Sequence, residues 1–391
     1  MPGFLSWAMA STWVQGQPFW VPWSWGHPRW WEPDRWCWQT CRRPAPLLEY
    51  INETATRRGT AVIYFDRRWD GATGIGRFCR EVAGRLDGIT ALPVTGNPAS
   101  GLDCIRLTLF MLLHPRAVVV SPGYSAPLLG LSRFVLTVHD LNHIDIAHNS
   151  GALKRLYYRL VLRRACRQAA KVLTVSEFSR SRIMAWADVP GTQVECVGNG
   201  VSEIFAESAK NDVTRPAADG FLFCVGNRKG HKNEAAVLRS LALLKEHPAL
   251  RVVFSGEPSQ GLLDAADTLQ LSDRVGFTGP LSESALADLY RDAAMLVFPS
   301  LYEGFGLPAV EAMATGCPVV ASSTTALGEI AAGASVKVDP ESDASIAEAI
   351  ARVADSTALR ETLQLQGYAR CKFYSWDLVG ARVRRVVDRL G

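Results

Sequence analysis

The chain has 391 residues, of which 48% are hydrophobic and 20% charged, a composition typical of a globular protein with two domains of ordinary size. Its net charge of +4 is too small to indicate nucleic-acid binding, although a basic patch facing an anionic membrane surface is compatible with it. A simple membrane-spanning helix is not expected, because such a helix needs about 18 apolar residues. The best apolar run, Leu107–Leu113, is shorter and is flanked by Arg106 and Arg116.

The nine cysteines are scattered and odd in number, and Cys37 and Cys41 are the only close pair. No histidine lies beside that pair to complete a zinc site. Met1–Trp20 lacks the positively charged start of a signal peptide. These features favour a cytoplasmic protein, and peripheral contact with the inner face of the cytoplasmic membrane stays open.

Residues 1–57 are predicted to be an extension outside the folded domains. Nine of the twelve tryptophans fall between Trp7 and Trp38, among prolines and with no period of 2 or 3.6. An interfacial anchor is one interpretation, since tryptophan favours the membrane–water boundary. We favour a disordered extension, such as one translated from upstream of the true start, because the first convincing strand begins at Ala61.

Residues 58–210 are predicted to form a first α/β domain, because short apolar strands alternate with helical patterns. Such alternation indicates a mainly parallel sheet covered on both faces. The expected strands are Ala61–Phe65, Ala117–Val120, Phe134–Val138 and Val172–Val175, and the expected helices are Phe78–Leu86 and Leu153–Ala170. Ser176 is expected to cap a further helix.

A glycine-rich turn, Gly71–Arg77, separates the first strand from its helix. It is not a dinucleotide-binding fingerprint, because Cys79 stands where the third glycine belongs. Gly74 and Gly76 are expected to allow a close backbone approach, and Arg77 to be a surface charge at the helix start.

The predicted helix Leu153–Ala170 is very basic, and Arg155, Arg159 and Arg163 share one of its faces at a spacing of four residues. Two interpretations are equally supported. The face either meets anionic lipid headgroups or is simply solvated.

Residues 211–375 are predicted to form a second α/β domain, after a polar linker at Ala206–Gly220. Its expected elements are strands Phe221–Val225, Arg251–Ser255 and Val275–Phe277 and a helix near Glu234–Leu244. Residues 376–391 are predicted to form a terminal amphipathic helix, with apolar positions Leu378, Val383, Val386, Val387 and Leu390. Two open sheets in tandem would place a ligand site in the cleft between them.

The segment Phe298–Ser322 is predicted to form a strand, a loop, a short helix and a second strand. Pro308 suits the first helical position and Gly316 the position just past the helix end. The loop carries Glu303 and two glycines, and its amides together with the helix N-terminus would bind an anion. Glu311 follows about one turn into the helix, so both carboxylates can face one cleft. The pattern indicates a ligand that is part sugar and part phosphate.

This segment resembles the glutamate–seven–glutamate signature of retaining, nucleotide-sugar-dependent glycosyltransferases, in particular glycosyltransferase family 4. The resemblance covers roughly Ala61 to Gly391. It implies the GT-B fold, which consists of two doubly wound Rossmann-like α/β domains facing a central cleft, with the last helix packing back towards the first domain. It also implies transfer of a hexose to a saccharide or lipid-linked saccharide. Similarity to bacterial surface-polysaccharide enzymes makes mannose from GDP-mannose the leading candidate.

The resemblance assigns expected roles within the signature. Glu311 should accept hydrogen bonds from the ribose hydroxyls of the nucleotide, and Glu303 should lie beside the donor sugar. The backbone amides near the start of the helix should meet the sugar and the distal phosphate; these belong to Gly304, Phe305, Gly306 and Leu307.

Three further segments are similar to family motifs. Val225–Asn233, VGNRKGHKN, resembles the basic diphosphate-binding loop, with Arg228 and Lys232 as its cations and Gly226 and Asn227 at its start. His139, in TVHDL, resembles the histidine that contacts the donor sugar from the acceptor side. The loop with Gly74 and Gly76 resembles the one near the acceptor and the distal phosphate.

Glycosyl transfer develops negative charge on the leaving diphosphate, so cations and amide donors are needed there. The chain has no DxD metal motif. The resemblance therefore implies a reaction without metal or other cofactor, in which Lys232, Arg228 and helix dipoles replace a divalent ion. Two alternatives remain. A sugar-nucleotide epimerase is disfavoured by the full signature, and a non-catalytic sugar-nucleotide-binding subunit would be expected to have lost Glu303, Lys232 or Glu311.

Overall fold

The computed structural model describes residues 61–146, 151–208 and 220–390, which fall in one compact unit, Gly59–Gly391. The tryptophan-rich extension, including Cys37 and Cys41, lies outside the described residues, as does most of the predicted linker. Among the described cysteines, those with free thiols are Cys79, Cys104, Cys166, Cys196, Cys224 and Cys371.

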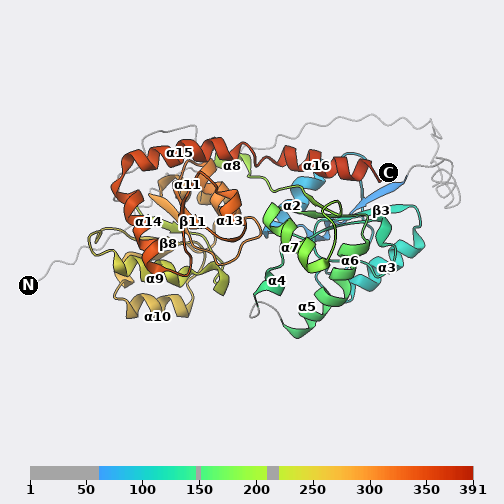
Figure 1. Cartoon of the computed structure of the whole chain (residues 1–391), viewed down its shortest axis with the longest axis horizontal. Coiled ribbons are helices and arrows are strands. Elements are labelled where there is room, and N and C mark those ends of the chain that lie inside the picture. Colours follow the sequence, from blue (N-terminus) through green and yellow to red (C-terminus); the bar gives the residue numbers. More distant parts are fainter. Residues whose placement is uncertain (1–60, 147–150, 209–219, 391) are drawn as a thin grey trace, which may run out of the picture. The chain divides into compact units, whose positions relative to one another are not determined.

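The described residues form two parallel sheets of six strands each (Figure 1). The first has the order β2-β1-β3-β4-β5-β6 and consists of β1 (Val62–Phe65), β2 (Thr90–Ala91), β3 (Ala117–Ser121), β4 (Phe134–Thr137), β5 (Lys171–Thr174) and β6 (Val194–Cys196). The second has the order β12-β11-β10-β7-β8-β9 and consists of β7 (Leu222–Cys224), β8 (Val252–Phe254), β9 (Val275–Phe277), β10 (Met295–Phe298), β11 (Val319–Ser322) and β12 (Val336–Val338). We refer to residues 61–202 as the first half and to residues 220–375 as the second half.

Helices cover both faces of the first sheet because successive strand residues point to opposite sides. Val120, Val135 and Leu173 join a buried cluster with the apolar residues of α2 (Gly74–Ala83) and α16 (Trp376–Asp388). Their neighbours on the other face pack against α3 (Asp103–Leu113) and α6 (Arg163–Gln168). Figure 1 shows α2 and α16 on one side of the sheet and α3 and α6 on the other. The predicted sheet with two covered faces is therefore confirmed.

The basic helix predicted at Leu153–Ala170 is present in three parts. These are α5 (Ala152–Tyr157), a π-helical turn (Tyr158–Leu162) and α6. The wider turn lets Tyr158 and Leu162 reach the core while α5 itself has no buried residue. The capping role predicted for Ser176 is confirmed, since its hydroxyl accepts from the Ser179 amide at the start of α7 (Glu177–Ala187).

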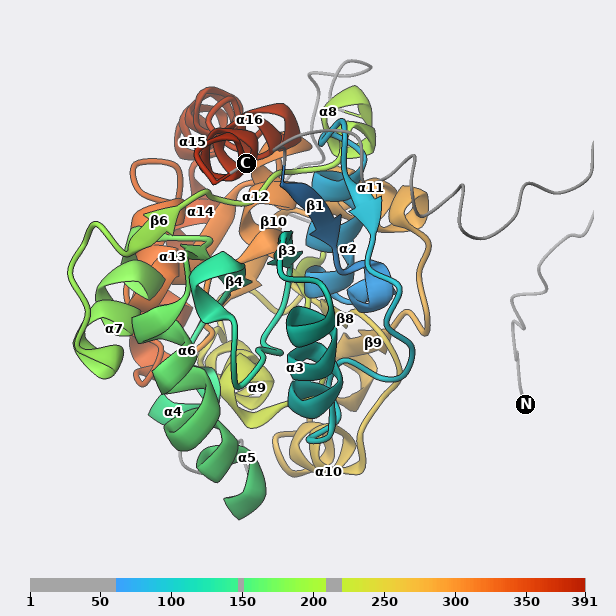
Figure 2. The ribbon, with the colours of Figure 1, turned by 90° about the vertical axis from the view of Figure 1, so that its right-hand side faces the viewer.

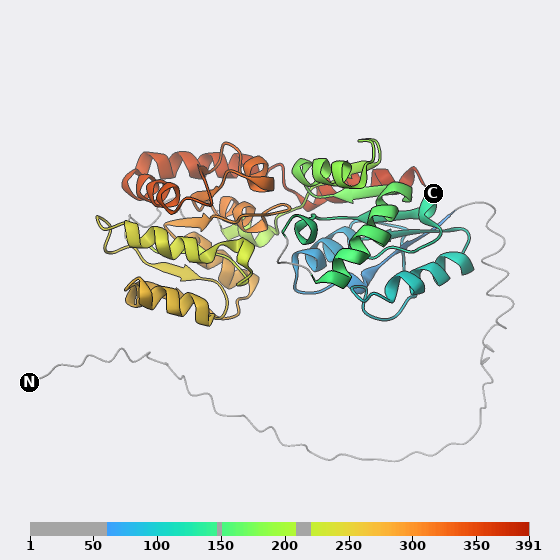
Figure 3. The same ribbon diagram turned by 60° about the horizontal axis from the view of Figure 1, so that its bottom comes forward.

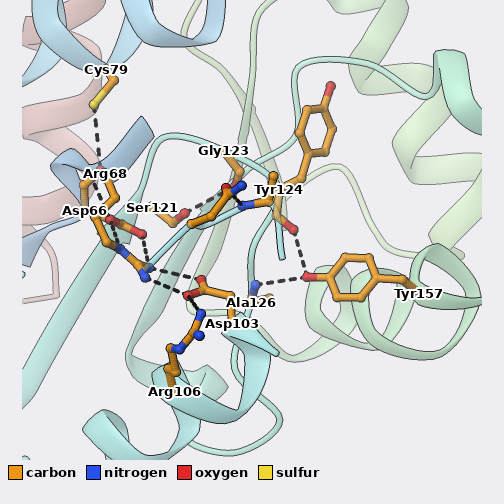
Figure 4. A network of polar contacts seen from close by, with 12 residues as sticks. Asp66, Arg68, Cys79, Asp103, Arg106, Ser121, Gly123, Tyr124, Ala126 and Tyr157 are labelled. Atoms are coloured by element: carbon orange, nitrogen blue, oxygen red, sulfur yellow. Dashed lines mark hydrogen bonds and ion pairs between the residues drawn. The ribbon is translucent and has the colours of Figure 1, made fainter. Parts of the chain in front are cut away.

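A buried ionic network fastens α3 to the end of β1 (Figure 4). Arg68 donates to both carboxylate oxygens of Asp66 and to Asp103, at 2.6 Å for the shortest bond to Asp103. Burial lowers the pKa of Arg68, but the two carboxylates outweigh it and raise the pKa overall. In the same figure, the Tyr157 hydroxyl donates to the Tyr124 carbonyl, which ties α5 to the loop after β3.

The second half is built from α9 (Glu234–Leu243), α10 (Gln260–Thr268), α11 (Glu283–Asp292), α12 (Leu307–Ala314), α13 (Thr325–Ile330), α14 (Asp343–Asp355) and α15 (Thr357–Cys371) around its sheet. The preceding helix α8 (Glu203–Ser208) also packs there, since the ring of Phe205 lies 6.1 Å from that of Tyr290 on α11. The sequence assigns these residues to the first domain, 58–210, whereas the helix that they form packs against the second half.

Helix α16 packs against α2 of the first half. Arg85 donates to Asp377 at 2.7 Å, and a Cβ at Gly380 would lie 2.8 Å from the Arg85 Cβ, so the two helices approach closely. Val383, Val386 and Val387 are buried as predicted. Leu378 is 43% exposed, contrary to the prediction, because Trp376 and Val379 take the inward positions of that turn.

Candidate active site

The signature segment has the predicted strand, loop, helix and strand. Strand β10 leads into a loop that ends at Gly306, where φ is 96° and α12 begins, with proline in its first turn. Such a φ favours glycine, and a Cβ there would also lie 2.4 Å from Leu327. Gly316, with φ 75°, follows the helix end before β11.

Lys232 and Glu303 form an ion pair in this loop region. The Lys232 Nζ lies 2.6 Å from Glu303 Oε1, and the two side chains are 14% and 11% exposed. The basic loop is held against the signature loop by the backbone, because the Leu301 amide donates to the His231 carbonyl. Two residues that the sequence assigned to one site, 71 positions apart, are therefore in contact.

Arg228 lies in the same basic loop but has other partners. Its guanidinium pairs with the buried carboxylate of Glu234 and donates to the carbonyls of Ser255 and Glu257. Gly226 is needed for this arrangement, since a Cβ there would lie 2.2 Å from a Glu234 oxygen. Asn227 is exposed. The predicted diphosphate role of these residues remains a prediction.

Glu311 is 4% exposed, and both of its oxygens are engaged. Oε1 accepts from Arg77 at 2.6 Å, and Oε2 accepts from the hydroxyl of Tyr290 at 3.1 Å. Burial raises the pKa of Glu311, although Arg77 opposes the rise. Arg77, which also pairs with Glu283 at 2.5 Å, is thus not the surface charge that the sequence indicated.

A cavity of about 230 Å³ lies at this carboxylate, between the start of α2 and the start of α12. Its lining comes from both halves of the chain: Gly71, Ala72, Thr73, Gly74, Arg77, Arg80, Glu283, Leu307, Pro308 and Glu311. Two helix N-termini border this space, and its charged side chains form ion pairs, Arg77 with Glu283 and Glu311 and Arg80 with Asp70. The amides of the helix N-termini can therefore donate to a ligand there.

Helix α2 begins at Gly74, so the prediction of a turn through Arg77 and a helix from Phe78 was wrong at that end. Thr73 caps the helix by accepting from the Gly76 amide at 3.2 Å, which permits the earlier start. A Cβ at Gly76 would lie 2.2 Å from the Gly71 carbonyl oxygen, so its own loop requires this glycine. Gly74 has more room and lines the cavity.

His139 is 8% exposed, and burial lowers its pKa, so the imidazole is neutral near pH 7. Its Nε2 lies 2.8 Å from the Pro122 carbonyl oxygen, which assigns the ring proton to Nε2 and leaves Nδ1 as an acceptor. The turn at His139 packs on the signature loop, because a Cβ at Gly304 would lie 3.0 Å from the His139 carbonyl.

The first half also holds the signature loop through two serines that sequence reasoning did not connect to it. The hydroxyls of Ser176 and Ser179 donate to the Gly304 carbonyl at 2.7 and 3.2 Å. Phe305, a predicted binding residue, turns its side chain into the core against Tyr374, with ring centres 5.4 Å apart. Only the backbone of Phe305 can therefore face a ligand.

Within the described residues, no group of three or more His, Cys, Asp or Glu side chains is placed to hold a metal ion. In the same part of the chain, no helix is both long and apolar enough to cross a membrane.

Comparisons with known proteins match both halves. The family model described as "Glycosyltransferase Family 4" matches residues 49–203, and "Glycosyl transferases group 1" matches residues 206–370. The O-antigen chain mannosyltransferase B of Escherichia coli is 29% identical over 292 residues, which cover 68% of this chain and 76% of the relative. The O-antigen chain mannosyltransferase RfbU of Salmonella typhimurium is 26% identical over 251 residues, covering 64% and 68%.

A solved structure of Anabaena Alr3699/HepE, in complex with UDP and glucose, is similar with a TM-score of 0.66 at 16% identity. The match covers 85% of this chain and all of that one, and at this identity it supports the fold alone. The two parallel sheets and this likeness confirm the predicted GT-B fold. With two family models that together span most of its length, the chain belongs to glycosyltransferase family 4.

Proposed function

We propose that this glycosyltransferase moves a mannosyl residue from a nucleotide diphosphate sugar, with GDP-mannose as the leading donor, to a saccharide or lipid-linked saccharide. The transfer retains the anomeric configuration and belongs to the synthesis of a cell-surface polysaccharide. Two relatives named as O-antigen mannosyltransferases, each matched over two thirds or more of its own length, support the sugar and the product class.

The observation that carries the proposal is the ion pair between Lys232 and Glu303. The family resemblance implies that Glu303 lies beside the donor sugar, so the ammonium group would lie next to the bond that must break. A cation held there stabilises the negative charge that develops on the leaving diphosphate. Because both side chains are mostly shielded from water, their electrostatic effect is stronger than it would be at the surface.

The proposed reaction breaks the bond between the anomeric carbon and the diphosphate oxygen and forms a bond from that carbon to the acceptor oxygen. Attack comes from the same face, and the acceptor proton passes to the departing phosphate oxygen. Glu303 stabilises the positive charge on the ring. His139, neutral and with Nδ1 open as an acceptor, holds a sugar hydroxyl.

Binding of the nucleotide involves Glu311 and the start of α12. The ribose hydroxyls donate to Glu311, whose oxygens are now shared by Arg77 and Tyr290. The phosphates meet the amides at the helix start and the lysine of the basic loop. We propose that these fixed positive groups serve in place of a divalent cation.

The test is a transfer assay with purified protein, GDP-, UDP-, ADP- and TDP-linked sugars and a panel of saccharide acceptors, with EDTA or with Mg²⁺ and Mn²⁺. The expected result is an α-mannoside formed from one nucleotide class at the same rate with EDTA. Formation of the β-anomer would contradict retention, and a rate restored only by a metal would contradict the role of the fixed cations. Transfer of another hexose alone would overturn the assignment of mannose.

A further inference from the structure

Helix α3 carries apolar residues on its exposed side as well as on its buried side. Leu107, Phe110 and Met111 pack into the core of the first half. On the other side, Leu109 and Leu112 are 55% and 57% exposed. Apolar residues on both sides of a helix are typical of a helix with neighbours on both sides. Figure 2 views α3 from its outer side, where no other described element covers it.

A second row of exposed leucines lies on α5 and the turn after it. Leu156 and Leu160 are 51% and 63% exposed, and no residue of α5 is buried. This short helix therefore contacts the core of the first half at Tyr157 and leaves Leu156 exposed. A cluster of exposed apolar side chains marks an interaction site rather than an ordinary surface.

The loop that follows β3 carries two further exposed leucines, Leu128 and Leu129, and contacts both α3 and α6. The Leu128 amide donates to Thr108 of α3 at 2.7 Å, and its carbonyl accepts from Arg164 of α6. Figure 3 shows α3 and α6 on the same side of the first sheet. We call this the leucine surface; it comprises Leu109, Leu112, Leu128, Leu129, Leu156 and Leu160.

Positive charge accompanies the leucine surface along α5 and α6. Between Cys104 and Ser176 the sequence has ten lysines and arginines but two acidic residues, while the whole chain has a net charge of only +4. Of these acids, Asp145 pairs with Arg182 and accepts from Tyr302, and Asp140 accepts from Tyr124. Lys154, Arg155, Arg159 and Arg164 are exposed beside the leucines.

We propose that the leucine surface and its basic rim dock on an anionic phospholipid bilayer. Leucines would enter the boundary between headgroups and acyl chains while the lysines and arginines pair with anionic headgroups. A second copy of this chain is a less suitable partner for the leucine surface, because the two basic rims would face and repel each other. The inference rests on exposure and charge and is independent of the proposed function.

The docking surface lies next to the candidate active site. The Lys154 Nζ lies 2.7 Å from the ring of His143 on α4 (Asn142–Asp145), and Asp145 of that helix accepts from Tyr302 at 2.8 Å. Tyr302 immediately precedes Glu303. An acceptor anchored in the bilayer could therefore approach the signature loop from the docked side.

The experiment measures binding of the full chain to vesicles by flotation, with neither donor nor acceptor present. Vesicles contain phosphatidylcholine alone or with about one third phosphatidylglycerol. We expect binding to the anionic vesicles only, weakened by salt. Leu109→Ser/Leu112→Ser/Leu156→Ser and, separately, Arg155→Glu/Arg159→Glu should each lower the partition coefficient at least ~10-fold.

Matched controls come from exposed residues of the second half. Leu243→Ser/Leu263→Ser/Leu365→Ser and Lys245→Glu/Arg251→Glu should bind as the wild type does. Circular dichroism checks folding, and if the leucine variant unfolds, the charge-reversed variant carries the test. Equal binding of wild type and both surface variants would overturn the proposal, as would no binding of the wild type. If the wild type sediments as a dimer and a surface variant as a monomer, while vesicle binding is unchanged, the leucine surface instead binds a second copy of this chain.

Discussion

Lys232 is held in an ion pair with Glu303 and, in the proposed site, also acts in the reaction. Replacing it by alanine removes the cation nearest Glu303 and leaves that carboxylate, 11% exposed, without its ion-pair partner. We expect Lys232→Ala to lower kcat by about 100-fold or more, which is typical for loss of one group that stabilises transition-state charge. Initial rates of mannosyl transfer measure the effect.

The control for this variant is Lys245→Ala, an exposed lysine after α9, which should leave the rate unchanged. Circular dichroism should show both variants folded. A Lys232→Ala enzyme that turns over nearly as fast as the wild type would exclude Lys232 from the chemistry.

Arg77 opposes the protonation of Glu311. Burial already raises the pKa of that carboxyl and Arg77 opposes the rise, so Arg77→Met should raise the pKa further. In the proposed site, the ribose hydroxyls need the deprotonated carboxylate of Glu311 as their acceptor. As pH falls from about 8 to about 5, nucleotide affinity should therefore be lost at a higher pH in Arg77→Met than in the wild type.

Titration calorimetry across this pH range measures the midpoint. Arg80→Met is the matched control, since Arg80 borders the same cavity but donates to Asp70 and Gly71 rather than to Glu311. Coincident midpoints for Arg77→Met and the wild type would show that Arg77 does not set the charge state on which nucleotide binding depends.

The sequence identified the site residues that belong to recognisable motifs. It did not identify residues whose role depends on contacts between distant parts of the chain. Glu303 and Lys232 were assigned to one site, and they are in contact. Arg77 was set aside because a basic residue at a helix start has many surface explanations, and its partner Glu311 lies 234 positions away. Ser176 was identified as a helix cap, but its bond to Gly304 depends on how the two halves meet.

At the scale of elements, the strands were predictable because buried parallel strands are short apolar runs. The start of α2 was not, since its glycines have low helix propensity and conceal the cap at Thr73. Packing requires glycine at Gly76, because a Cβ there would lie 2.2 Å from the Gly71 carbonyl oxygen. At Gly74, by contrast, there is space for a Cβ.

These two glycines give a prediction about stability. Gly76→Ala should lower the free energy of unfolding by about 1–3 kcal/mol, because the Gly71 backbone must move. Gly74→Ala should change it by less than about 1 kcal/mol, since the nearest atom outside the helix lies 3.6 Å away. Urea denaturation measures both, and equal effects would show that the loop adapts freely.

At the scale of the molecule, the tandem sheets were predictable from alternating strands and helices, whereas the contacts between the halves were not. The contacts that join them concentrate near the candidate site, through Arg77 with Glu311 and Ser176 with Gly304. One hydrophobic cluster also contains both Phe78 of the first half and Val310 of the second. We therefore expect the two halves to unfold together.

A thermal scan with and without donor tests this coupling. A ligand at about 100 times its Kd stabilises the native state by about 2.7 kcal/mol, so the correct nucleotide sugar should raise a single Tm by several degrees. Lys232→Ala should reduce the shift, because it removes the charge that meets the diphosphate in the proposed site. If two transitions appear and the donor shifts only one, the halves unfold separately and the bound donor contacts one of them alone.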